Sequence, residues 1–272
     1  MVYSAGMLNV AQPGFMAIGG YSAALALTRG FPLWQGLLIG FIVIAIVAYI
    51  LAHVTARLTG VYLAVATMAF MLIVQQLIVI NPSIGGAVGI HGIPMLLNPW
   101  SGFLILAGVS LFAYGIMKSR LGYEMRIVRE DEVAARSVGI DVRAVRIQTC
   151  LLSAWVAGIA GTMNATHSSF IGPDDFGFST LIRILSFAIV GGTDRWWGAV
   201  LGAAFLTYLA EGTRIFQAWR EVLSGAIILG VVLLFPEGIV GGVFRLQRIL
   251  VRRQKRTEMA TPIPAPGIRR GR

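Results

Sequence analysis

The residues best suited to chemistry in this chain are concentrated in one segment, residues 118–146. This charged segment holds seven of the 22 basic residues and five of the 12 acidic residues of the 272-residue chain. Ionised side chains at this density stay in water, because burying unpaired charge is costly, and they recognise partners by ion pairing. The charged segment therefore predicts a solvent-exposed surface at which another protein docks.

Side chains that could form a catalytic, metal or nucleotide site are scattered. His53, His91 and His167 stand singly without metal-ligand spacing, and the single Cys150 lies in an apolar stretch. Neither lysine of the chain follows a glycine-rich loop that could cradle phosphate groups. We therefore predict no catalytic residues, no metal site and no cofactor. If the chain takes part in active transport, a partner must supply the energy.

The composition places the chain in a membrane. Apolar residues make up 57 % and charged residues 12 % of it, and the mean hydropathy is +0.78, whereas soluble domains carry about 25 % charged residues. The 33 glycines suit helices that approach one another closely in a bilayer. The net charge of +10 is confined to a few loops and the tail, which argues against a nucleic-acid partner. The sequence predicts an all-α, polytopic membrane protein.

Eight apolar segments are predicted to cross or enter the bilayer, because a spanning helix needs about 20 mainly apolar residues. Two of them could be half-helices or re-entrant pieces: residues 5–28 are interrupted by polar residues and Pro13, and residues 179–193 are short and carry Arg183. The six clear segments are 33–56, 58–80, 100–118, 145–167, 196–213 and 222–242.

The distribution of basic residues predicts the orientation. With the N-terminus inside and all eight segments as crossings, 18 of the 22 basic residues lie in the cytoplasm, although removing two adjacent spans would preserve this pattern. We expect a multi-pass protein of a bacterial or archaeal cytoplasmic membrane, with a cytoplasmic C-terminus. Residues 1–244 form the predicted transmembrane domain, and residues 245–272 form a basic tail that is predicted to be disordered.

The predicted spans contain almost no ionisable residues. A transporter driven by ions usually keeps carboxylates or histidines near the midplane, because such costly residues persist there for function. Arg183 is the only charge well inside a segment, and it either lines the pathway or extends to the outer interface. The energy source is therefore predicted to lie outside these helices.

Residues 124–139 are predicted to form one helix of good helix formers that ends at Gly139. Ala134 and Ala135 would leave a low surface that a partner could cover closely, although a solvated helix without a partner is the alternative. Three valines are too few to form a core-facing stripe: Val128, Val133 and Val138. The charged residues expected to set the register of docking are Arg126, Arg129, Glu130, Asp131 and Arg136.

In this helix the chain resembles the permease subunits of ABC importers, whose cytoplasmic loop carries a Glu-Ala-Ala…Gly coupling motif. Ala134, Ala135 and Gly139 keep the spacing of that motif, whereas Glu132 stands one residue early. The chain is more specifically similar to the LivM-type branched-chain amino acid permeases. Five stretches carry this similarity in family order over about residues 5 to 242: 60–67, 85–94, 129–132, 190–192 and 235–238.

The resemblance implies the ABC importer permease fold and a subunit that forms the pathway for branched-chain or other small amino acids. The implied partners are a second, homologous permease, two cytoplasmic ABC ATPase subunits and an extracytoplasmic solute-binding protein, besides membrane lipid. The binding protein would dock on loops 81–99 and 169–178. The implied ATPase-coupling residues are Arg126, Arg129, Glu130, Asp131, Glu132, Ala134, Ala135 and Gly139. The candidate pathway residues are Tyr62, Thr67, Arg183, Gly191 and Gly192.

Two other functions stay open. Related permeases carry urea or short amides, and a different class would be a stand-alone secondary transporter or channel; a membrane-embedded enzyme is disfavoured because no polar residues cluster. One departure from the resemblance concerns the start of the chain. Family members usually have a further apolar span before the stretch that resembles residues 6–21, so we expect the chain to be truncated or to begin at a late start site.

Overall fold

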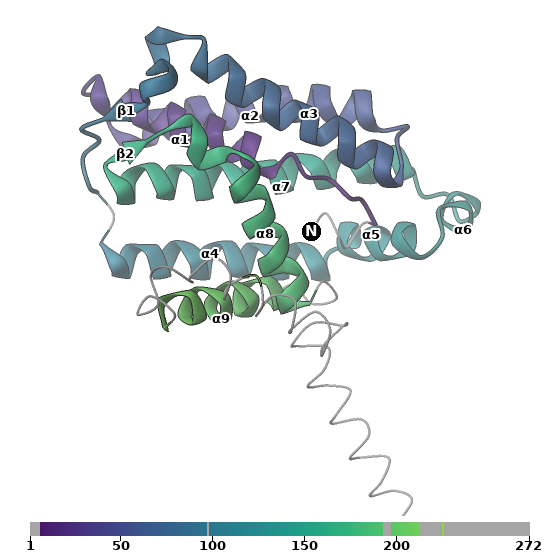
Figure 1. The fold of residues 1–272 in the computed structure, drawn as a ribbon. Coiled ribbons are helices and arrows are strands. Elements are labelled where there is room, and N and C mark those ends of the chain that lie inside the picture. The colour runs from purple at the N-terminus through teal and green to yellow at the C-terminus, as the bar shows by residue number, and fades with distance from the viewer. Residues whose placement is uncertain (1–5, 97, 193–196, 213–224, 226–272) are drawn as a thin grey trace, which may run out of the picture. The chain divides into compact units, whose positions relative to one another are not determined.

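The computed structural model describes residues 6–96, 98–192, 197–212 and 225, and the chain divides into two compact units, residues 1–186 and 187–272. Nearly all of the described chain is helical (Figure 1). The helices are α1 (Gln12–Thr28), α2 (Leu33–Thr55), α3 (Gly60–Val79), α4 (Pro99–Lys118), α5 (Arg120–Glu130), α6 (Glu132–Ser137), α7 (Val142–Ser168), α8 (Phe178–Gly191) and α9 (Gly198–Gly212). The two strands are β1 (Ile90–His91) and β2 (Phe170–Ile171).

The helices confirm the predicted all-α, polytopic class. Helices α2, α3, α4 and α7 are each long and apolar enough to cross a membrane, and α1, α8 and α9 are shorter. Together they occupy seven of the eight predicted segments. The eighth segment, 222–242, and the predicted tail, 245–272, lie outside the described residues.

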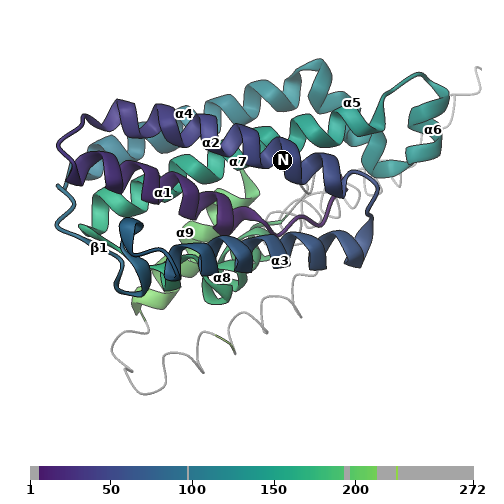
Figure 2. The ribbon, with the colours of Figure 1, turned by 90° about the horizontal axis from the view of Figure 1, so that it is seen from above.

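Helices α1, α2 and α7 form the packed centre of the first unit (Figure 2). They approach so closely that a Cβ atom at Gly19 would overlap the carbonyl oxygen of Gly158, and one at Gly161 would overlap that of Met16. The Thr162 hydroxyl also donates a hydrogen bond to the Gly19 carbonyl oxygen, at 3.1 Å. Lipid is as apolar as the side chains, so this close contact and the interhelical hydrogen bond hold the helices together.

Helix α1 begins inside the bundle, not at residue 5 as predicted. Residues 7–11 run without helical structure, and Pro13 then lies in the first turn, where its missing N–H has no cost. The Thr67 hydroxyl accepts the N–H of Val10 at 3.1 Å, and Asn9 Oδ1 accepts that of Ala11 at 2.9 Å. The non-helical backbone at this depth is therefore satisfied by polar side chains, as a membrane interior requires.

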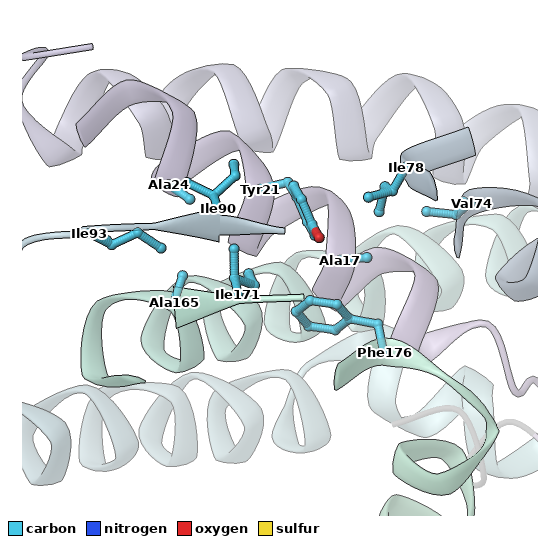
Figure 3. Close-up of a cluster of buried hydrophobic side chains, with 10 residues drawn as sticks. All are labelled: Ala17, Tyr21, Ala24, Val74, Ile78, Ile90, Ile93, Ala165, Ile171 and Phe176. Atoms are coloured by element: carbon cyan, nitrogen blue, oxygen red, sulfur yellow. The ribbon is translucent and has the colours of Figure 1, made fainter. Parts of the chain in front are cut away.

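The two strands join one end of α3 to one end of α7. Strands β1 and β2 pair antiparallel, with Ile90 opposite Ile171 and His91 opposite Phe170. Figure 3 shows the buried cluster beneath this pair. Its members come from α1, α3, α7 and the two connections: Ala17, Tyr21, Ala24, Val74, Ile78, Ile90, Ile93, Ala165, Ile171 and Phe176.

The second unit contains the end of α8 and α9, which also meet through glycines. A Cβ atom at Gly191 would overlap the carbonyl oxygen of Gly198, and one at Gly202 would overlap that of Phe187. These positions accept only a hydrogen atom as side chain, so glycine is required for the two helices to approach this closely.

Candidate functional site

Helix α5 has a buried apolar face, contrary to the prediction that the valines are too few to form one. Gly122, Met125 and Val128 are buried, at the spacing of three residues that places side chains on one face of a helix. They pack with side chains of the preceding and following elements: Met7, Leu63, Met117, Ala135, Val142 and Val145. The prediction failed because it considered the valines alone and left out Met125.

The single predicted helix over residues 124–139 is wrong, because the chain forms two helices that meet at Asp131. Asp131 has extended backbone angles (φ −156°, ψ 112°), and its Oδ1 accepts the N–H groups of Val133 at 2.7 Å and Ala134 at 3.0 Å. Aspartate is a preferred residue for capping a helix start in this way. The predicted stop is confirmed: α6 ends at Ser137, and Gly139 adopts the left-handed conformation (φ +82°).

Helix α6 presents a different surface from the one predicted. Ala135 is completely buried inside the protein, so it cannot form a low surface for a partner together with Ala134. The exposed apolar side chains are instead Val133 (78 % exposed) and Val138 (70 % exposed). Ala135 packs one side of this short helix against the protein, so Val133 on another side faces solvent. Helix α6 lies at the far end of the bundle (Figure 1). Asp131, a preferred capping residue, signals where α6 begins but not which of its sides is buried.

A buried arginine holds α6 onto the bundle. Arg146, whose side chain is 10 % exposed, donates a hydrogen bond from Nη2 to the Glu132 carboxylate and one from Nη1 to the Ala56 carbonyl oxygen, at 2.9 Å. Ala56 is the C-cap residue that follows the last helical residue of α2. We call this contact the Arg146 bridge. It ties α6, α7 and α2 together, so Arg146 belongs to the packed structure and not to a solvated loop as predicted.

The other predicted coupling residues line the exposed surface of α5 and α6. Arg126, Arg129, Glu130 and Arg136 are all exposed. The Arg126 guanidinium lies over the Tyr123 ring, 5.8 Å from its centroid. The structure thus leaves these four charges exposed on α5 and α6, while Asp131 and Glu132 mainly serve the chain's own helices.

The predicted pathway residues are divided between the two units and differ in burial. Thr67 and Tyr62 both belong to α3. Thr67 is buried against the start of α1, whereas Tyr62 is 78 % exposed. Arg183 is an exposed residue of α8, and Gly191 and Gly192 are buried in the second unit. The Thr67 hydroxyl contacts the interrupted start of α1, which resembles the discontinuous helices that form transporter sites.

Substitution of Thr67 by valine tests the role of this contact. Valine has a similar shape but cannot accept the Val10 N–H, so about 1–3 kcal/mol of stability is expected to be lost. The apparent melting temperature in detergent should fall accordingly. Thr28→Val is the control, because the Thr28 hydroxyl is exposed and bonds only within its own helix. Equal shifts for the two variants would contradict the role of Thr67.

The loops predicted to bind a second partner form one continuous surface. The β1–β2 pairing joins loop 81–99 to loop 169–178, and the His91 ring lies over Phe170 with centroids 4.4 Å apart. Gln75 Nε2 lies 3.5 Å from Asp174 Oδ1 beside it. Val88 is 73 % exposed on this surface. This surface and α6 lie at opposite ends of α7. The 27 residues of α7, at 1.5 Å per residue, separate them by about 40 Å.

Comparison with known proteins places this arrangement among transport permeases. Residues 1–232 match the family model described as "Branched-chain amino acid transport system / permease component". No solved structure matches the chain significantly.

Three relatives illustrate the similarity. The high-affinity branched-chain amino acid transport system permease protein LivM of Escherichia coli (strain K12) and that of Salmonella typhimurium are each 28 % identical, over 86 % of this chain and 64 % of the relative. The autoinducer 2 import system permease protein LsrC of Klebsiella pneumoniae is 27 % identical, over 57 % of this chain and 45 % of the relative.

The alignment covers less than two thirds of the length of these LivM relatives. The family match nevertheless covers most of the chain and agrees with its apolar, membrane-spanning helices. The chain therefore belongs to the family of permease components of branched-chain amino acid transport systems.

Proposed function

We propose that the chain is a permease subunit of an ATP-driven importer and forms part of the pathway for branched-chain or other small amino acids across the cytoplasmic membrane. The family match and the LivM relatives support this function. The structural observation that carries it is α6, a capped six-residue helix at the end of the bundle that exposes Val133 and carries an ion pair between Arg136 and Glu132.

In this function α6 is the coupling helix. A groove of an ATPase subunit covers Val133 and Val138, and the surrounding arginines and Glu130 set its register. The Arg146 bridge then carries a movement of α6 to α7 and to the end of α2. Positively and negatively charged residues at the rim of such a contact favour correct orientation more than they add affinity.

The proposed assembly contains two ABC ATPase subunits in the cytoplasm and a second, homologous permease. The surface formed around β1 and β2 receives an extracytoplasmic binding protein. Residues 1–244 form the transmembrane domain, with the N-terminus and the basic tail in the cytoplasm. The basic residues on the α5–α6 side support this orientation through the positive-inside rule.

Two matched valine substitutions test the two docking surfaces. Val133→Asp should weaken co-purification of the ATPase subunits about ten-fold or more, because it puts a charge into a covered apolar contact, yet leave the binding protein unaffected. Val88→Asp should do the reverse. Each valine is almost fully exposed in the chain itself, so neither variant should lower the melting temperature.

The comparison separates a lost contact from a misfolded protein, since each variant is the folding control of the other. If Val133→Asp leaves ATPase binding and ATP-driven uptake at the wild-type level, the coupling role of α6 is wrong. Uptake by the reconstituted chain alone, without ATP, would favour the other class, a secondary transporter or channel.

The substrate is proposed from the relatives and calls for its own test. The LivM names point to branched-chain amino acids and the LsrC name to autoinducer 2, while urea and short amides are the further alternative. Calorimetric titration of the binding protein that co-purifies with the chain should show tightest binding for leucine, isoleucine or valine. Binding of autoinducer 2 or urea instead would replace this substrate class.

A further inference from the structure

An apolar groove runs between α1, α2 and α3 on the side where β1 and β2 lie. It has a volume of about 650 Å³, and apart from a few polar residues its lining is hydrocarbon. Ile39, Val43 and Val47 form one side at a spacing of four residues along α2, and Ile73 and Leu77 of α3 form the other. Ile39 and Ile73 are more than half exposed, so the groove is open at its edge.

The length of the groove matches one leaflet of a bilayer. Along α2 it extends from Gln35 to Val47, about 18 Å at 1.5 Å per residue. A bilayer core is about 30 Å thick, so one leaflet accounts for about 15 Å, whereas a spanning helix needs the whole thickness. A single hydrocarbon chain therefore fits the length of the groove better than a helix that spans the whole bilayer.

The end of the groove carries a positive charge at the height of the membrane surface. Arg29 lines this end and is exposed, and within the described part of the chain it forms no ion pair. Phe31 and Trp34 beside it are 54 % and 62 % exposed, and aromatic residues of this kind mark the membrane–water interface. The charge therefore lies where the phosphate of a lipid would lie.

We propose that the groove between α1, α2 and α3 binds one acyl chain of an anionic glycerophospholipid whose phosphate pairs with Arg29. The acyl chain lies along Ile39, Val43 and Val47, and the guanidinium can bond two phosphate oxygens at once. The groove contains no residue of α6, so this site can be tested independently of the proposed coupling role.

Native mass spectrometry of the full chain tests the headgroup contact. Phosphatidylglycerol and phosphatidylcholine with the same acyl chains are added to the delipidated protein in detergent. The wild type should retain phosphatidylglycerol preferentially, and Arg29→Gln should weaken this binding about five-fold, to the level of phosphatidylcholine. Arg57→Gln is the matched control, because Arg57 is exposed but does not line the groove. Equal retention of the two lipids by the wild type would overturn the proposal.

A photo-crosslinking residue at Val43 tests what covers the groove in the assembled transporter. In native membranes the adduct should have the mass of a phospholipid and should decrease when Arg29→Gln is added. The same residue at Val54, which is exposed outside the groove, should give no Arg29-dependent lipid adduct. An adduct between Val43 and a protein, whether another subunit or another segment of this chain, would show that protein and not lipid covers the groove.

Discussion

Replacing Gly161 by alanine is expected to cost about 3 kcal/mol and to prevent most of the protein from folding correctly. The new Cβ atom would overlap the carbonyl oxygen of Met16 in α1, and backbone on both sides cannot move away as a flexible side chain could. Overpacking a tight interface commonly costs about 1–3 kcal/mol, and a clash with backbone lies at the upper end. The yield of monodisperse protein and the melting temperature in detergent measure the effect.

Gly108→Ala is the matched control, because Gly108 also lies in a long apolar helix but has no atoms within 4 Å of an added Cβ. Alanine favours helix by up to about 1 kcal/mol over glycine, so this variant should be as stable as the wild type or more stable. Opposite signs for the two substitutions are the expected result. A Gly161→Ala protein as stable as Gly108→Ala would contradict the close packing of α1 on α7.

Arg146→Met is expected to have the second largest effect, through the loss of the Arg146 bridge. Methionine leaves the Glu132 carboxylate and the Ala56 carbonyl oxygen without their donor. Removing one partner of a fully buried pair costs about 3–5 kcal/mol, and about 2–3 kcal/mol is expected here because the Glu132 side chain is 34 % exposed. Hydrogen exchange should show α6 less protected, and ATP hydrolysis should continue with little uptake of solute.

A second substitution distinguishes the loss of this pair from a general defect. In Glu132→Gln with Arg146→Met the unpaired carboxylate is absent, so part of the stability should return and the two effects should not be additive. Arg143→Met controls for loss of a positive charge on the same helix: Arg143 is exposed and bonds His53 at 2.8 Å, a contact of less than about 1 kcal/mol. Additive effects at Glu132 and Arg146 would contradict the bridge.

The membrane-spanning helices could be predicted closely from the sequence. Residues 33–56 and 100–118 were predicted, and α2 and α4 span Leu33–Thr55 and Pro99–Lys118. Such agreement is expected because the length of an apolar run is set by the thickness of the bilayer, which is the same for every helix. The end of α6 near Gly139 was predictable for a similarly local reason, since glycine readily adopts the left-handed conformation.

The details of the candidate site could not be predicted in the same way. Most residues of the predicted helix 124–139 favour helix, and the break at Asp131 arises where capping competes with a continued helix. Whether Glu132 faces a partner or its own chain depends on Arg146, 14 residues away, which local propensity does not include. The burial of Ala135 and the exposure of Val133 follow from the same long-range contact.

The β1–β2 pair has a mechanical consequence for the first unit. Its hydrogen bonds, together with that from Ile93 N–H to the Ser169 carbonyl oxygen at 3.2 Å, connect the loop that follows α3 to the residues that directly follow α7. If α3 and α7 rotate against each other as rigid rods while these bonds persist, the strand pair acts as a fulcrum. The displacement is then smallest at this end and grows along the lever arm towards Leu63 and Val145, where α5 and α6 are packed.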